Sequence, residues 1–265
     1  MTPTTYGFFD TAEQVERARL ATHNGLWDTF TFRKLGELGD LAGWRCLEIG
    51  AGTGSVASWL LEQVGAAGHV VATDIETTGL EPLRAANLEV RYHNVIVDPL
   101  EQSGYDLIHA RLVLEHLPQR DVIAAKLTRA LRPGGWLVVE DYDIQPMETI
   151  VPAHAAWTAV HNAVRGVLRS SGVEPSYGSR LLPVLRSIGL ADVSAEGYVR
   201  PSWMRDLAPV FRPVLARMRD TMLTMGVIDA DALEQTLELF DSDEHVCYSP
   251  LLVSARGRRM LGACT

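Results

Sequence analysis

Apolar residues in this chain form short continuous runs that alternate with stretches in which they recur every three or four positions. Such runs are typical of parallel strands buried on both faces, and the recurrence is typical of helices. The runs predict strands at 44–49, 69–74, 88–95, 105–111, 136–140, 191–199 and 251–255. The recurrence predicts helices near 11, at 29–38, 56–64, from 118, and at 153–168, 181–188, 206–225 and 231–240. Strands that alternate with helices indicate an α/β fold with a mostly parallel sheet.

A glycine-rich turn joins the first predicted strand to the next helix, in the stretch Cys46-Leu47-Glu48-Ile49-Gly50-Ala51-Gly52-Thr53-Gly54. Glycine allows the unusual backbone angles of such a turn and lets the backbone approach a ligand closely. The start of the helix then directs free N–H groups at that ligand. A dinucleotide fingerprint would require a third glycine at the sixth position of the turn, which is Ser55 here. This disfavours an NAD-dependent oxidoreductase.

The glycines instead occupy the first, third and fifth positions, and Glu48 precedes them by two residues. This spacing resembles motif I of the class I S-adenosylmethionine (SAM) dependent methyltransferases. The stretch from Tyr105 to Pro118 and the turn Leu131-Arg132-Pro133-Gly134-Gly135 resemble motifs IV and V of the small-molecule, UbiE-like members. The resemblance covers roughly residues 44–143. It implies a Rossmann-like doubly wound sheet of seven strands in the order 3-2-1-4-5-7-6, with the last strand antiparallel and the ligand at the carboxyl ends of the strands.

Asp74 ends the second predicted strand, where a carboxylate can accept two hydrogen bonds from the ribose hydroxyls of an adenosine. The alternative is that Asp74 only caps a helix after Glu81-Pro82. Ile75 would lie against the adenine. The resemblance implies a wider set of SAM-binding residues, with Glu48 at the ammonium group and Arg111 near the methionine portion: Glu48, Gly50, Ala51, Gly52, Gly54, Asp74, Ile75, Asn94, Val95, Ala110 and Arg111.

Two of these residues leave alternatives open. Asn94 stands where the family often has Asp, and its carbonyl oxygen could still accept a hydrogen bond from the adenine amino group. Arg111 could instead form an ion pair with Glu115 or Glu48.

The resemblance also implies that residues 1–40 form a helical lid over a SAM-binding domain of residues 41–265. Tyr6, His23, Trp27 and Arg33 are candidate lid residues, with surface helices packed on the sheet as the alternative. Segments at about 143–180 and 203–241 are expected to form a helical cap over the acceptor. In the second segment Val214, Met218, Met222 and Met225 share a helical stripe, which is either core or the lining of an apolar pocket.

The implied reaction is methyl transfer from SAM, with S-adenosylhomocysteine (SAH) as product, to an O, N or C nucleophile of a small molecule. Candidates for a catalytic base near the strand ends are His116, Tyr142 and Asp143, none of which can be assigned. His154 and His161 lie near an apolar helical stripe and are more typical of packing residues. The alternative function is a SAM-binding protein that no longer methylates, such as a cyclase that uses the cofactor structurally.

Composition narrows the choice of partner. A net charge of −9 over 265 residues argues against nucleic acid, and the three cysteines, Cys46, Cys247 and Cys264, lack the paired spacing of a metal site. The chain contains no apolar run of membrane-spanning length, and its first ten residues lack a secretory pattern. We therefore expect a cytoplasmic methyltransferase without a metal, with a small-molecule acceptor, for which secondary metabolism is one setting, and with a homodimer as an open possibility.

Overall fold

The computed structural model of the chain describes residues 13–261, with side chains from Gly25 onward. Within this range the main sheet comprises β1 (Arg45–Ile49), β2 (His69–Asp74), β3 (Leu88–Tyr92), β4 (Tyr105–Arg111), β5 (Leu131–Asp143), β7 (Ala191–Tyr198) and β10 (Leu251–Arg258). Their order is β3-β2-β1-β4-β5-β10-β7, and β10 is antiparallel to both of its neighbours. Counted along the chain within this sheet, the order is 3-2-1-4-5-7-6. The prediction of fold and strand order is confirmed.

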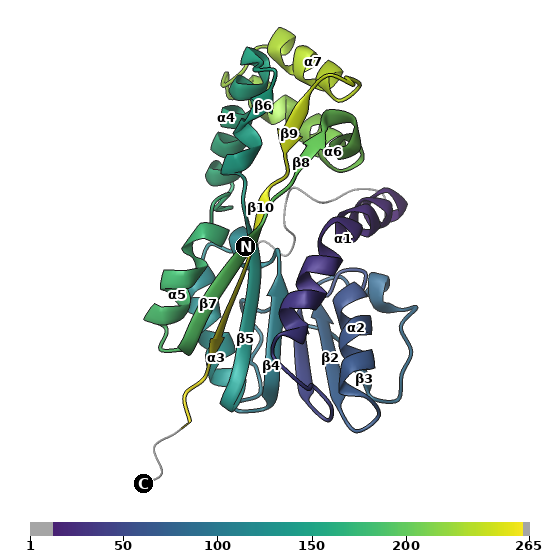
Figure 1. Ribbon diagram of the computed structural model, residues 1–265, viewed down its shortest axis with the longest axis vertical. Coiled ribbons are helices and arrows are strands. Elements are labelled where there is room, and N and C mark those ends of the chain that lie inside the picture. Colours follow the sequence, from purple (N-terminus) through teal and green to yellow (C-terminus); the bar gives the residue numbers. More distant parts are fainter. Residues whose placement is uncertain (1–12, 262–265) are drawn as a thin grey trace.

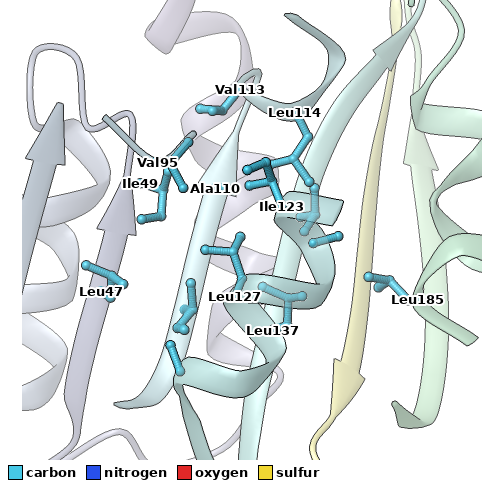
Figure 2. Close-up of a cluster of buried hydrophobic side chains, with 14 of the residues drawn as sticks. Leu47, Ile49, Val95, Ala110, Val113, Leu114, Ile123, Leu127, Leu137 and Leu185 are labelled. Carbon is cyan, nitrogen blue, oxygen red and sulfur yellow. The ribbon is translucent and has the colours of Figure 1, made fainter. Parts of the chain in front are cut away.

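Helices cover both faces of this sheet (Figure 1). One face packs against α1 (Glu13–Gly36) and α2 (Ser55–Val64) through a core that includes Cys46 and Leu60. The other face packs against α3 (Arg120–Ala130) and α5 (Leu181–Ser187), and Figure 2 shows its core, with Leu47 and Ile49 of β1 facing Leu127 of α3. Successive strand residues point to opposite faces, so the central strands contribute apolar side chains to both cores.

A second group of elements lies beyond the carboxyl end of β5 (Figure 1). It contains α4 (Ala155–Ser170), α6 (Met204–Thr224), α7 (Ala230–Leu239) and a small sheet of β6 (Ile150–Val151), β9 (Val246–Tyr248) and β8 (Pro201–Trp203). We call this group the cap. Its own apolar core includes Met218 and Met222 of the predicted methionine stripe, whereas Met225 is 45% exposed. In the described part of the chain no helix is both long and apolar enough to span a membrane.

Several element boundaries differ from the prediction. One continuous helix, α1, replaces the two helices expected near 11 and at 29–38. Residues 81–87 form turns and coil where a helix was expected, after a short 3₁₀ helix at Thr78–Leu80. β3 ends at Tyr92 because a turn follows, in which the amide of Asn94 donates to the Asp98 carboxylate at 2.7 Å. The small sheet was not predicted, since strands of two or three residues carry no periodicity.

Candidate functional site

The β1–α2 turn is packed at both ends and open in its middle. Gly50, Gly52 and Gly54 have φ angles of 69°, 55° and 81°, a region that favours glycine. A Cβ atom at Gly50 would lie 2.4 Å from Cγ2 of Val113, and one at Gly54 would lie 2.4 Å from Cδ1 of Leu83. A Cβ atom at Gly52 would meet no described atom within 4 Å. A ligand can therefore lie against the backbone at Gly52.

Asp74 lies beside this turn at the carboxyl end of β2. Its Oδ2 accepts a hydrogen bond from the Gly52 amide at 2.8 Å, and its Oδ1 accepts one from the Glu76 amide at 3.1 Å. The alternative that Asp74 caps a helix after Glu81 is therefore wrong. Burial raises the pKa of the Asp74 carboxyl group, although the two amide donors oppose this effect. Each carboxylate oxygen can accept a further hydrogen bond, so this group can also bind a ligand's hydroxyls.

The next strand end contributes Asn94 and Val95. The amide of His93 donates to the carbonyl oxygen of Asp74 at 2.9 Å, which holds this segment beside β2. The side-chain oxygen of Asn94 accepts a hydrogen bond from the Ile96 amide at 3.0 Å, and Val95 is buried in the core that Figure 2 shows. The Asn94 oxygen retains a second lone pair for a ligand. The loops that follow β1, β2 and β3 thus lie side by side at the carboxyl ends of these strands.

Glu48 is only 2% exposed, and its Oε2 lies 2.8 Å from Nδ1 of His109 on β4. The two residues are register partners on adjacent parallel strands, so their side chains lie on the same face. His109 was not among the predicted site residues, although a histidine between the apolar residues Ile108 and Ala110 was a visible signal.

Arg111 binds side chains of α1, and not Glu115 or Glu48. Its Nη2 donates to Oδ1 of Asp28 at 2.9 Å, and its Nη1 donates to the Thr31 hydroxyl at 3.0 Å. The alternative of an ion pair of Arg111 with Glu48 or Glu115 is therefore wrong. The reason is that α1 crosses the carboxyl end of β4 and brings Asp28 to this position.

The chain leaves β4 in a strained conformation. Leu112 has a φ angle of 56°, which is unusual for a residue with a branched side chain, and its amide donates to the Glu140 carbonyl oxygen at 2.7 Å. Backbone strain of this kind is concentrated at functional sites. The side chain of Ala110 points away from α1, to the sheet face opposite that of Arg111. It is fully buried in the core that Figure 2 shows, so it contributes to packing.

Trp27 is the lid candidate that is buried against the sheet. It is 1% exposed, and its ring lies edge-on to Tyr142 and Tyr198, with centroid distances of 5.6 and 6.0 Å. Arg33 instead forms ion pairs with Glu37 and Glu196 at the surface, as expected for a surface helix. Tyr6 lies outside the described residues. His23 belongs to α1, but its side chain lies outside the described range.

The three candidates for a catalytic base lie at the end of β5 and in the loop after β4. Tyr142 lies on the α1 face of β5, whereas Asp143 points to the other face and accepts hydrogen bonds from the Ser179 hydroxyl and the Gln145 amide. His116 lies 3.3 Å from Oε1 of Glu115 in the loop after β4. Burial raises the pKa of Glu115 to about 7. The Glu115 carboxylate also accepts a hydrogen bond from the Tyr142 amide at 2.7 Å, so Glu115 joins the loop of His116 to the end of β5.

The two histidines of α4 belong to the cap. His161 is buried, and burial together with the nearby Arg165 lowers its pKa to about 4, so its imidazole is neutral at pH 7. The ring of His154 lies edge-on to that of His245, with a centroid distance of 6.0 Å. Both arrangements match the interpretation of these histidines as packing residues.

Comparison with known proteins gives evidence on the family that is independent of the geometry. A family profile described as "Methyltransferase domain" matches residues 47–137, the segment that holds the glycine turn, Asp74 and Arg111. The chain is 34% identical to methyltransferase str2 of Strobilurus tenacellus over 187 residues, which are 66% of this chain and 64% of that protein. It is 29% identical over 207 residues to 27-O-demethylrifamycin SV methyltransferase of Amycolatopsis mediterranei, covering 69% of this chain and 72% of that protein. The match thus spans just under two thirds of the length of str2.

The fold is similar to that of phosphoethanolamine N-methyltransferase 2 of Haemonchus contortus, solved with phosphomonomethylethanolamine and S-adenosylhomocysteine. The TM-score is 0.56 at 15% identity, over 88% of this chain and 53% of that chain. At this level of identity the similarity concerns the fold alone.

Proposed function

We propose that the chain is a class I SAM-dependent methyltransferase, which transfers the methyl group of SAM to an O, N or C nucleophile of a small molecule. One observation carries the proposal. The glycine turn is open at Gly52, and the amide of Gly52 is held by Asp74, an acid at the end of the adjacent strand. Backbone N–H groups, a carboxylate and open space at one strand edge fit a nucleoside with a charged tail.

The residues present can hold SAM, with SAH as the product. Asp74 would accept the ribose hydroxyls, the segment at Asn94 and Val95 with Ile75 would meet the adenine, and Glu48 would face the ammonium group. When bound, SAM supplies a methyl group on a positively charged sulfur, which an electron-rich atom can displace. The chain mainly has to align that atom and exclude water, which raises the effective concentration of the two reactants.

We further propose that residues 1–40 act as a lid and that the segments at about 143–180 and 203–241, which supply the helices of the cap, enclose the acceptor. Trp27 supports the first part, because it seals α1 against Tyr142 beside the strand ends. The relative named for 27-O-demethylrifamycin SV favours a small-molecule acceptor, with secondary metabolism as its setting.

The test is calorimetric titration of the purified protein with SAM, SAH and NADH. Binding of both sulfur compounds at micromolar concentration, without binding of NADH, would support the cofactor assignment. A panel of small acceptors would then be screened for release of SAH. Binding of SAM without SAH release from any acceptor would favour the alternative, a cyclase-like protein that uses SAM structurally. Absence of binding to either sulfur compound would refute the proposal.

A further inference from the structure

The sheet face under α1 changes from apolar to charged toward the carboxyl ends of the strands. On β1, β4 and β5 this face begins with Cys46, Leu107 and Val138, which are all buried in one apolar core. Two residues farther along each strand, the same face carries Glu48, His109 and Glu140. These three side chains are at most 2% exposed. A cluster of ionisable groups is therefore enclosed between the sheet and α1.

His109 lies between the two carboxylates of this cluster. Its Nδ1 is 2.8 Å from Oε2 of Glu48, and its Nε2 is 3.5 Å from Oε2 of Glu140. Burial alone would lower the pKa of His109, but Glu48 and Glu140 outweigh burial and raise it to about 9. An imidazolium with an N–H group on each side can neutralise a carboxylate on either strand.

The cluster continues into α1 through side chains alone. Oε2 of Glu140 accepts a hydrogen bond from the Thr31 hydroxyl at 2.5 Å, and the oxygen of that hydroxyl accepts one from Arg111. Arg111 also donates to Asp28, one helical turn before Thr31. Asp28 in turn accepts a hydrogen bond from the hydroxyl of Ser55, at the start of α2, at 3.2 Å. An unbroken series of contacts thus joins Glu48 to the helix that precedes the first strand.

We propose that His109 is a positioning residue that orients the Glu48 carboxylate and, through Glu140 and Thr31, couples ligand binding at Glu48 to the docking of α1 on the sheet. The inference rests on the proposed function, because it takes Glu48 as the acid that faces a ligand's ammonium group. Such coupling is reciprocal: a ligand that favours the ordered Glu48 carboxylate also stabilises docked α1, and docked α1 strengthens binding of that ligand.

The first part of the test measures SAH affinity by calorimetry and hydrogen exchange of the α1 amides at 25–36. In the wild-type protein, SAH should slow exchange along this part of α1. His109→Gln removes the cation and should weaken SAH binding about tenfold or more. The matched control His69→Gln, at the half-exposed start of β2, should retain wild-type affinity.

The second part uses a variant that leaves Glu48 and His109 unchanged, so that the test does not depend on the stability of His109→Gln. Thr31→Val should weaken SAH binding about fivefold or more and reduce the protection of α1. Thr31→Ser, which restores the hydroxyl, should recover both. Thr128→Val, which removes a hydroxyl from α3 on the opposite face, should change neither.

The outcomes separate this inference from the proposed function. If the wild-type protein binds SAH but Thr31→Val and Thr128→Val bind it equally well, or if SAH leaves α1 exchange unchanged, the coupling is refuted and the methyltransferase proposal stands. If the wild-type protein binds neither SAM nor SAH, both are refuted. A loss of affinity in Thr31→Val that Thr31→Ser does not recover would also overturn the role given to the hydroxyl.

Discussion

The Gly52 amide donates to the Asp74 carboxylate at 2.8 Å, and this single hydrogen bond joins the loops that follow the first two strands of the sheet. The two residues are 22 positions apart in the sequence, and each stabilises the position of the other. The Asp74 carboxylate fixes the position of the turn at Gly52, and the Gly52 amide satisfies one oxygen of this half-buried carboxylate.

Replacing Asp74 with Ala should weaken SAM binding roughly 10- to 100-fold, the range expected for lost hydrogen bonds to a charged acceptor. The fold should remain intact, because the replaced side chain lies at the carboxyl end of β2 and outside the apolar cores. Calorimetric titration with SAM, together with circular dichroism of the free protein, measures both effects. The control is Asp40→Ala, since Asp40 also accepts a backbone amide, that of Ala42, but lies on the surface away from the site. Unchanged SAM affinity in Asp74→Ala would refute the ribose assignment.

Gly52→Ala tests whether the open space at the turn is a binding site. The added Cβ meets no described atom, so the cost to stability should be only that of a left-handed alanine, about 1 to 2 kcal/mol. SAH affinity should fall at least tenfold if the ligand lies against this backbone. Thermal unfolding and calorimetry measure the two quantities separately.

Gly226→Ala is the matched control for that variant. Gly226 has a φ angle of 64° and open space at its Cβ position, but it lies at the end of α6 in the cap. It should show a similar loss of stability with unchanged SAH affinity. Equal SAH affinities in the two variants would mean that the open space at Gly52 is not used by the ligand.

The main sheet and the glycine turn could be predicted from the sequence because their signals are local. Each central strand is a continuous apolar run, and the turn needs glycines at fixed positions. The ion pair of Arg111 with Asp28 could not be predicted in this way. Its partners are 83 positions apart, and their contact depends on where α1 crosses the sheet. The sequence pointed instead to Glu115, four positions away, and to Glu48 on the adjacent predicted strand, and both have different partners in the structure.

The cluster around His109 could be predicted from the sequence in part. The predicted strands at 44–49, 105–111 and 136–140 each contain one member of the cluster, and strand alternation together with their register places Glu48, His109 and Glu140 on one face. The third strand is longer than predicted, because the turn expected at 131–135 belongs to β5 (Leu131–Asp143). What the sequence lacked was the identity of the helix that covers this face. α1 was expected as two helices, although Gly25 lies inside a single continuous helix and is tolerated there. The contact of Thr31 with Glu140 followed only from the structure.

Acidification should destabilise the protein through His161. Burial and Arg165 lower the pKa of His161 to about 4 in the folded state, against an ordinary value of 6.5. The unfolded chain therefore takes up a proton first, and the free energy of unfolding should fall by up to about 3 kcal/mol between pH 6.5 and pH 4. Urea unfolding at a series of pH values measures this slope.

The variant His161→Leu should lack that part of the slope, whereas His69→Gln should keep it. The comparison between variants isolates His161 from other acids that titrate in the same range. If His161→Leu lost stability on acidification as steeply as the wild-type protein, His161 would not be the buried neutral group that the structure indicates.

For His109 the contribution to the free energy of unfolding should depend on pH in the opposite direction. Glu48 and Glu140 raise its pKa to about 9 against burial, so its contribution to stability is complete below pH 6.5 and is lost as the pH rises toward 9. The difference in unfolding free energy between wild type and His109→Gln should therefore shrink by up to about 3 kcal/mol over that interval. NMR titration of the His109 ring in the wild-type protein gives the midpoint directly. Glu140→Gln, which removes one of its two carboxylates, should lower that midpoint, and a midpoint near 6.5 in the wild-type protein would show that the cluster holds no imidazolium.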